Sequence, residues 1–554
     1  MAKQQVPVWA DPEVPEEALD PQGLSRRGLI RGAGLLGAGF AAAGIGGVAG
    51  AGEAAATGGT AYADPELVYL VGDHHVHSRY SHDAKYDFTQ HAQRGAQFGL
   101  DWMAFTEHSN FGQADKGAQA ENVEVLKARA ENPRMLIFQG LEWYIPAAEH
   151  GTVLVAPGPN NVALLQQFER EYDGKLTNRS ADTADNESHA IKALQWLAAQ
   201  KRSGYVDDVL VLANHPLRLG IDAPHELRGW RDSGVMIGME GAPGSQGDAD
   251  PAWVAYRGTT GSQRGEYVNN PGTGSFPGYP NDAYRTYGGF DWATATVGGL
   301  WDAMLAEGKL FSITSNSDNH RTIWDTWTDG VFPPGQNFDS LGWKPSPTDT
   351  GTPQAGSDFW PGQFSRTHVG VTKYGYLDVM AGLRTGRVWV DHGQLVDGID
   401  VRVAPAGSSH RGVTLGGRLK VRRSERLELR VTVTSATRPN FHGLLPRLAH
   451  LDVIRGVVTG TAPDKDSWRA PDTRVVEQVD VHRKTGTYTL RIPLGPAERS
   501  HYLRLRGSDG KRNGPGYLGR KIDPAGPIQH PNGDGDPWLD TWLYTNPVFV
   551  DVTR

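Results

Sequence analysis

Short apolar runs alternate with helix-like patterns through residues 64–398 of the chain. Each run has the length of a buried strand, whereas apolar residues three and four positions apart between the runs are typical of helices. Strands that alternate with helices predict a parallel sheet, and this number of repeats favours a closed β/α barrel. Strands are expected at 67–71, 102–105, 135–138, 152–156, 209–213, 235–239, 310–314 and 388–390, and helices at 88–98, 187–199 and 376–383.

Two long stretches rich in Gly, Pro and aromatic residues interrupt this pattern, at 241–291 and 324–361. Because loops of this length in a compact domain usually carry function, we interpret both as lids over the mouth of the barrel. Their aromatic side chains could stack the ring of a base or a sugar, or could pack in the interior. These residues include Trp253, Tyr256, Tyr267, Tyr279, Tyr284, Trp324 and Trp327.

The pattern changes near residue 399, where apolar and polar positions begin to alternate. The alternation is strict over 426–434 and shorter over 488–492 and 502–506. A period of two residues between turn-forming segments is typical of antiparallel strands. We therefore expect an α/β barrel domain at 64–398, followed by an all-β, sandwich-like domain at 399–554 whose last strand lies within 538–552.

Residues 1–63 have the features of an export signal. Arg26 and Arg27 precede a Gly/Ala-rich run at 32–51 and an Ala-x-Ala sequence at 61–63, and this order resembles a bacterial twin-arginine signal. The alternative, a chance arginine pair before a membrane anchor, is less favoured because the run is Gly-rich and short for a span. We expect the twin-arginine machinery to export the protein to the periplasm or the exterior. The mature chain has no stretch of about 18 apolar residues, so no stable membrane span is expected.

Composition excludes several classes of protein. The chain has 554 residues, of which 38% are hydrophobic and 21% charged, and this is typical of a globular protein with more than one domain. Its net charge of −8, without a basic block, lacks the signature of a nucleic-acid-binding protein. The absence of cysteine excludes disulfides, thiolate metal ligands and cysteine nucleophiles.

Metal-binding residue types gather at the ends of the predicted strands. His75 and His77 lie two positions apart at the end of the first strand, so their imidazoles are expected on one face. The carboxyl ends of barrel strands meet on one face, and imidazole and carboxylate groups are ligands for zinc, manganese and iron. The other candidates in these positions are Asp83, Glu107, His108, Glu142, His150, His215, Asp318 and His320.

These motifs, in this order, resemble the PHP domains, named after polymerase and histidinol phosphatase, over roughly residues 64–395. The motifs are His75-x-His77, Thr106-Glu107-His108, Gly140-Leu141-Glu142, Asn214-His215-Pro216 and Ser317-Asp318-Asn319-His320. The resemblance implies a distorted seven-stranded (β/α)7 TIM-like barrel that holds two or three divalent ions of zinc, manganese or iron. It implies a first ion held by His75, His77, Glu142 and Asp318, a second by Glu142, His150 and His215, and a third by Asp83, His108 and His320.

Two positions depart from the family pattern. Where the family has Ser-Asp-Gly, this chain has Ser81-His82-Asp83-Ala84, so His82 could replace Asp83 as a ligand, although the spacing from His77 favours Asp83. Glu107 stands where Asp is more common, and we interpret it as a residue that orients a ligand, the alternative being a plain surface acid. His74 should point away from its neighbours as a packed or solvated bystander.

Three further residues could bind a phosphate group. Arg218 follows His215, and Arg366 and His368, within residues 364–369, precede an expected strand. A guanidinium group can bind phosphate through two hydrogen bonds. The alternative for each arginine is a bond to a neighbouring carboxylate.

The sequence therefore predicts a secreted, metal-dependent phosphoesterase that hydrolyses a small-molecule phosphate ester by a metal-activated hydroxide at a di- or trinuclear site. Glu142, Asp318 and His320 are the predicted catalytic residues, and either His320 or a water would protonate the leaving group. One alternative is an amidohydrolase-like enzyme, which the late Asp318-x-His320 motif disfavours. The other is a non-catalytic secreted protein that binds the envelope or a polysaccharide through the C-terminal region.

Overall fold

The computed structural model describes residues 66–244, 271–281, 283–284, 286–322, 325–356, 358–440, 445–481, 484–509 and 541–553. The predicted export signal lies outside these residues, as do Trp253, Tyr256, Tyr267 and Trp324 of the two inserts. Within the described part of the chain, no helix combines the length and the apolar character needed to cross a bilayer.

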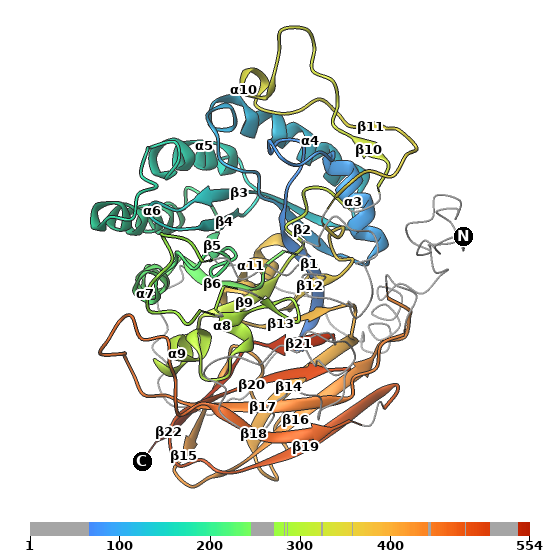
Figure 1. Cartoon of the computed structure of the whole chain (residues 1–554). Helices are drawn as coiled ribbons and strands as arrows, with labels where there is room; N and C mark the ends of the chain where they lie inside the picture. The colour runs from blue at the N-terminus through green and yellow to red at the C-terminus, as the bar shows by residue number, and fades with distance from the viewer. Residues whose placement is uncertain are drawn as a thin grey trace, which may run out of the picture.

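A mixed sheet rich in parallel strands forms the centre of the molecule (Figure 1). Within this part of the sheet, β4 and β12 run antiparallel to the strands beside them, and the remaining strands share one direction. Their order is β12 (Ser365–Val371), β1 (Val68–Val76), β2 (Trp102–Phe105), β3 (Leu136–Tyr144), β4 (His150–Val155), β5 (Val209–Ala213), β6 (Met236–Ala242) and β9 (Ser312–Ser315).

Helices lie along the outside of these strands (Figure 1). Because both faces of the sheet are covered, β2 and β5 are buried at every position and consist almost wholly of apolar residues. The helices are α3 (Phe88–Gln97), α4 (Ala118–Glu131), α5 (Asn161–Tyr172), α6 (Ala184–Arg202), α7 (Pro224–Asp232), α8 (Trp292–Ala295), α9 (Leu300–Ala306), α10 (Phe338–Leu341) and α11 (Tyr376–Arg384), with a π-helical turn, η2, at Gln113–Gly117.

The two ends of this strand path meet through one side chain. The hydroxyl of Thr367 on β12 donates to the backbone carbonyl of Ser315 on β9 (2.6 Å) and accepts from the Ser315 N–H (2.8 Å). The Thr367 side chain thus joins β9 to β12 by hydrogen bonds of the kind that backbone groups make between paired strands. The predicted mixed α/β class is confirmed, whereas the seven-stranded (β/α)7 barrel stays a prediction.

The C-terminal region is all-β, as predicted, and it packs as two layers around an apolar core. One layer is the sheet β14 (Val396–Pro405), β16 (Arg426–Ser435) and β19 (Thr487–Pro496). The other contains β15 (Arg418–Arg422), β17 (His450–Val457), β18 (Arg474–Asp480), β20 (His501–Ser508), β21 (Trp542–Thr545) and β22 (Val548–Thr553).

The second layer is continuous with the central sheet, because β21 pairs with β13 (Val388–His392), which in turn pairs with β12. The predicted last strand is two strands, separated at Asn546 and Pro547, where proline cannot donate to a ladder. Short two-residue ladders occur in the inserts: β7 (Thr286–Tyr287) with β8 (Phe290–Asp291), and β10 (Trp327–Thr328) with β11 (Thr348–Asp349).

Candidate metal centre

The end of β1 places two imidazoles side by side. His75 and His77 have no exposed surface, and their Nε2 atoms lie 3.0 Å apart. The backbone here is fixed by Asp73, whose carboxylate accepts from the N–H groups of His75 (3.1 Å) and Ser317 (3.0 Å). The same network therefore joins the end of β1 to the turn that carries Asp318.

Glu142, near the end of β3, lies at the centre of the cluster. Its Oε1 is 3.2 Å from His75 Nε2, 3.1 Å from His150 Nδ1 and 3.3 Å from His215 Nε2. Its Oε2 is 3.3 Å from His77 Nε2 and 2.7 Å from His108 Nδ1. Burial alone would raise the pKa of Glu142, but the surrounding imidazoles outweigh burial and hold this pKa well below its usual range.

Two ligand candidates lie in left-handed turns. Asp318 (φ 44°) and His215 (φ 29°) have positive φ, which is uncommon for residues other than glycine and concentrates at functional sites. In this conformation Asp318 Oδ1 lies 3.1 Å from His75 Nε2 and 3.2 Å from His77 Nε2. The turns thus direct both side chains back toward the strand ends.

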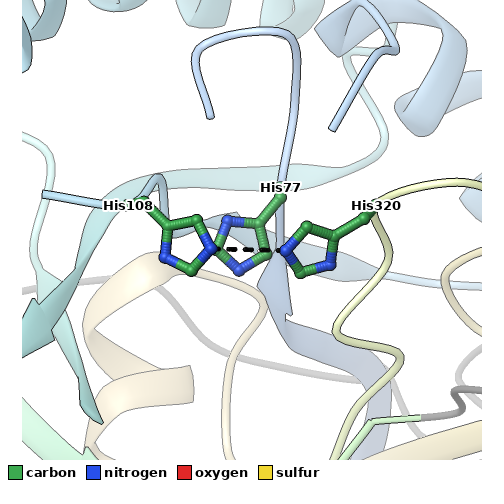
Figure 2. A group of neighbouring side chains, drawn as sticks. All are labelled: His77, His108 and His320. Atoms are coloured by element: carbon green, nitrogen blue, oxygen red, sulfur yellow. Dashed lines mark hydrogen bonds between the residues drawn. The ribbon is translucent and has the colours of Figure 1, made fainter. Parts of the chain in front are cut away.

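Three imidazoles from distant parts of the chain face one another beside this cluster (Figure 2). His77, His108 and His320 could hold one ion, and the Nε2 atoms of His108 and His320 are 3.4 Å apart. Asp83 lies against this group, with Oδ2 3.4 Å from His108 Nε2 and Oδ1 3.7 Å from His320 Nε2. Burial alone would lower the pKa of His108, but Glu142 and Asp83 outweigh burial and raise it to about 10.

All nine predicted ligands therefore converge in one region. Seven of them, with Glu149, form overlapping groups that could each hold an ion: His77 with His108 and His320; His75 with His77 and Glu142; His108 with Glu142 and His150; and His150 with His215 and Glu149. Asp318 and Asp83 lie against these groups through His75, His77 and His108. His82, the alternative to Asp83, has a side chain that is 55% exposed, and its Nδ1 lies 3.7 Å from Asp83 Oδ1. The contacts of Asp83 with two imidazoles favour Asp83 as the ligand.

Comparison with known proteins gives the family of this site. Residues 73–215 match the model of the PHP domain. The predicted resemblance to PHP domains is confirmed over these residues. The match includes seven of the nine candidate ligands, and Asp318 and His320 follow it in the chain.

Similar solved structures include a two-domain protein from Bacteroides vulgatus that contains a predicted PHP-like metal-dependent phosphoesterase. It is 13% identical with a TM-score of 0.32, and the alignment covers 85% of this chain and 98% of that one. A proposed metal-dependent phosphoesterase from Bifidobacterium adolescentis is 14% identical with a TM-score of 0.17, covering 30% and 76%. An amidohydrolase from Chromobacterium violaceum with bound sulfate and no metal is 20% identical with a TM-score of 0.13, covering 25% and 51%. No match is found among the curated proteins.

The donor atoms of the PHP site fit divalent cations. The outer nitrogen of His75, Nδ1, lies 2.7 Å from Glu240 Oε1, and that of His77 lies 2.9 Å from Ser81 Oγ. Both Nε2 atoms are thus left facing each other and the carboxylates of Glu142 and Asp318. Two buried imidazole lone pairs 3.0 Å apart repel unless a proton or a cation lies between them, and nitrogen and oxygen donors in this mixture suit zinc, manganese or iron.

Glu107 has the orienting position that its sequence context suggested. It is fully buried, and its carboxylate accepts hydrogen bonds from Ser78 and Ser81. Ser81 in turn contacts His77. The surface-acid alternative is therefore wrong. His74 is packed rather than solvated: it is buried against Thr314, and burial lowers its pKa to about 4.

A cavity of about 510 Å³ opens over the cluster. Arg218 and Arg321 line it together with Tyr144, Asp358 and His82. Seven of the candidate ligands also line it: Asp83, His108, Glu142, His150, His215, Asp318 and His320. The Arg218 side chain is 32% exposed and lies 3.4 Å from Glu149 Oε2. A guanidinium group at the wall of this cavity can bind an anionic substrate.

Arg366 and His368 do not line this cavity, which corrects the expectation that they bind phosphate. Both lie within β12, and both bind the carboxylate of Asp391 on β13: Arg366 through Nε (3.0 Å) and Nη2 (2.6 Å), His368 through Nε2 (2.8 Å). The His368 ring also stacks on Trp389. The alternative, an arginine bound to a neighbouring carboxylate, describes Arg366 correctly.

Glu240 and Glu149 are among the carboxylates that support the site and that sequence reasoning missed. Glu240 accepts from His75 Nδ1 and from the His215 N–H (2.7 Å each), and Glu149 Oε2 lies 3.5 Å from His215 Nδ1. Glu240 directly follows the predicted strand 235–239, so the rule that found the other candidates could have found it too. Glu149 precedes His150, and no comparable pattern marks it.

Proposed function

We propose that the chain is a metal-dependent phosphoesterase that hydrolyses a small-molecule phosphate ester. The observation that carries the proposal is the convergence of nine His, Asp and Glu side chains beneath a cavity that two arginines also line. The PHP match over residues 73–215 supports the same class of chemistry. Arg218 would bind the phosphoryl oxygens, because its guanidinium reaches the cavity beside His215.

The residues would hold two or three ions of zinc, manganese or iron. His75, His77, Glu142 and Asp318 would hold the first, Glu142, His150 and His215 the second, and Asp83, His108 and His320 the third. Divalent ions in such sites lower the pKa of water toward neutrality and neutralise charge on phosphoryl oxygens. Glu142 lies against five imidazoles, so it would be shared between the ions, and Glu240 and Ser81 would keep His75 and His77 in the required orientation.

The proposed place of action is the periplasm or the exterior, reached through the twin-arginine machinery. Support comes from the arginine pair at Arg26 and Arg27 and the Gly/Ala-rich run behind it. Fractionation of cells that express the full chain and an Arg26→Lys, Arg27→Lys variant tests it. The wild type should be found outside the cytoplasm and the variant inside.

The proposed activity predicts phosphate release that depends on bound metal. The purified chain should contain two or three metal ions by mass spectrometry, and it should hydrolyse a chromogenic phosphomonoester or phosphodiester faster than a matched amide. Removal of metal by a chelator should abolish turnover, and zinc, manganese or iron should restore it.

Glu142→Gln tests the centre of the cluster, because the neutral amide removes the charge that several imidazoles share. We expect at least a hundredfold loss of turnover, in the range seen when metal-ligand interactions are removed, with an unchanged circular dichroism spectrum. A folded Glu142→Gln protein with near-normal turnover, or a wild type without metal, would contradict the proposal.

A further inference from the structure

The second insert lies along one side of the metal centre. Its described residues, 325–356 and Asp358, are here called the clamp. The clamp carries β10, α10 and β11 and runs beside α3 and α4, as the yellow segment in Figure 1 shows. These helices adjoin the loops from which Asp83 and His108 project, so the clamp contacts a defined part of the ligand set.

The clamp holds the loop that carries Asp83 from both sides. The Lys344 N–H donates to the Arg79 carbonyl (2.8 Å), and Arg79 Nη1 donates to the Lys344 carbonyl (2.6 Å). Lys344 Nζ donates to the carbonyl of Ala84, the residue after Asp83 (2.8 Å). Arg79 and Lys344 are both buried, so these bonds are shielded from water.

A second buried contact lies at the end of the same loop. Lys85 Nζ donates to Asp325 Oδ1 at 2.8 Å, and both side chains are almost fully buried. The Tyr86 hydroxyl also bonds the Asp325 carboxylate, and it accepts from the Thr322 N–H (2.6 Å). This pair thus connects the Asp83 loop to the turn that carries His320.

The clamp also binds the turn of His320 directly. Asp358 is 2% exposed, and its Oδ2 accepts from the N–H groups of His320 (2.5 Å) and Arg321 (2.8 Å). The Asp358 N–H donates to the Arg321 carbonyl (3.0 Å). These three bonds fix the backbone from which the His320 imidazole projects.

The remaining ligands are held by other parts of the fold. Glu142 and His150 lie on the paired strands β3 and β4, and His215 donates its N–H to Glu240. Asn214 donates to Glu142 Oε1 (3.0 Å). Because different segments hold the two sets of ligands, a substitution that disrupts the clamp contacts should change metal binding at one set and leave the other set intact.

We propose that the clamp positions Asp83 and His320, and thereby sets the occupancy of the ion position shared by Asp83, His108 and His320, separately from the position at His75, His77 and Glu142. This inference rests on the proposed metal centre. Asp358 and Lys344 are positioning residues in it, because their hydrogen bonds with the ligand-bearing segments are to the backbone, although Asp358 Oδ2 also lies 4.0 Å from His320 Nδ1.

The test is a count of bound metal, which needs no substrate. Wild type, Asp358→Ala and Asp358→Asn are loaded with manganese, dialysed and measured by mass spectrometry. Asp358→Ala should lose one ion per chain, while the others remain. Asp358→Asn should restore part of the lost occupancy, because its amide oxygen can still accept one backbone N–H. Thr350→Val is the matched control, since the Thr350 hydroxyl forms its hydrogen bonds, among the described residues, with Thr326, Thr352 and Gln354 of the clamp. The metal content of this variant should equal that of the wild type.

The outcomes separate this inference from the proposed function. A wild type without metal overturns the proposed metal centre. A loaded wild type whose Asp358→Ala variant keeps every ion, or loses all of them with its fold intact, overturns the clamp proposal. If Asp358→Ala fails to fold by circular dichroism, Lys344→Met replaces it, because that change removes the ammonium contact with Ala84 and keeps the aliphatic stem. The loss of one ion in Lys344→Met supports the proposal, and an unchanged count overturns it.

Discussion

At the scale of single residues, the nitrogen that each imidazole can offer to a metal ion depends on the hydrogen bond that its other nitrogen forms. The Ser81 hydroxyl has one hydrogen, which it donates to Glu107 Oε2 at 2.7 Å. It must therefore accept from His77 Nδ1–H, and this leaves the lone pair of His77 on Nε2, facing Glu142 and Asp318. A serine outside the predicted ligand set thus decides which nitrogen His77 can offer to an ion.

Ser81→Ala should weaken metal binding tenfold to a hundredfold, the usual effect of losing a partner that orients a ligand. The affinity is measured by competition with a chromogenic chelator. Ser78→Ala is the matched control, because Ser78 Oγ also donates to Glu107 (2.6 Å), whereas the His77 Nδ1 atom pairs with Ser81. A change of equal size in both variants would show that the effect comes from Glu107 and not from the His77 tautomer.

At the scale of elements, β12 shows where sequence reasoning succeeds and where it fails. The strand starts at Ser365, but its apolar residues start only at Val369, so the sequence pattern predicts Arg366 and His368 ahead of the strand. They are buried because Asp391 lies opposite Arg366 across the ladder to β13 and neutralises it. Pairing between strands 25 positions apart cannot be read from periodicity.

The metal ligands, by contrast, could be predicted because their positions depend on local sequence patterns and not on strand pairing. Each of them except His150, which precedes the next strand, follows an apolar run, and every such run forms a strand. The alternation of patterns therefore locates the side chains before any strand pairing is known. Glu240 directly follows the predicted strand, which ends at Met239 although β6 continues to Ala242, so the same rule could have located it. Its contacts with His75 and His215 come from chain segments 165 and 25 residues away and have no local signal.

Asp391→Asn should lower the free energy of unfolding by about 3–5 kcal/mol at neutral pH, because it leaves the Arg366 charge buried without a counter-ion. Burial alone would raise the pKa of Asp391, but Arg366 and His368 outweigh it and hold this pKa well below its usual range. Because the pKa of Asp391 is lower in the folded chain than in the unfolded chain, its carboxylate stabilises the fold fully above the unfolded pKa of about 3.9. This stabilisation is lost as the pH falls toward the pKa of the folded state.

The difference between wild type and Asp391→Asn in urea unfolding should therefore be largest above about pH 4 and should narrow at lower pH. Glu498→Gln, which changes an exposed pair with Arg423, is the control and should leave the free energy of unfolding nearly unchanged. A difference that stays constant down to acid pH would mean that packing, and not charge, makes Asp391 important.

At the scale of the whole molecule, the C-terminal β region is structurally part of the metal-bearing region. Asn546 donates to the Ile313 carbonyl (3.0 Å) and accepts from the Ile313 N–H (2.8 Å), so it binds the strand β9 that leads to Asp318. Arg504 forms a two-pronged, fully buried pair with Asp302 on α9 (2.8 and 2.6 Å). Because β21 also pairs with β13, separating the two regions would expose a buried charge pair and an unpaired strand edge.

The two regions should consequently unfold together. Calorimetry of a chain that begins at residue 64 should show one transition, with equal calorimetric and van't Hoff enthalpies. Asn546→Ala should lower the midpoint of that single transition, because the backbone groups of Ile313 lose their partner and remain buried. A chain that ends at residue 405 should not fold, since β13 would keep its apolar edge residues without β21. Two separate transitions, or a soluble chain ending at residue 405 that still binds metal, would instead show that the β region is an independent module attached to a self-sufficient metal site.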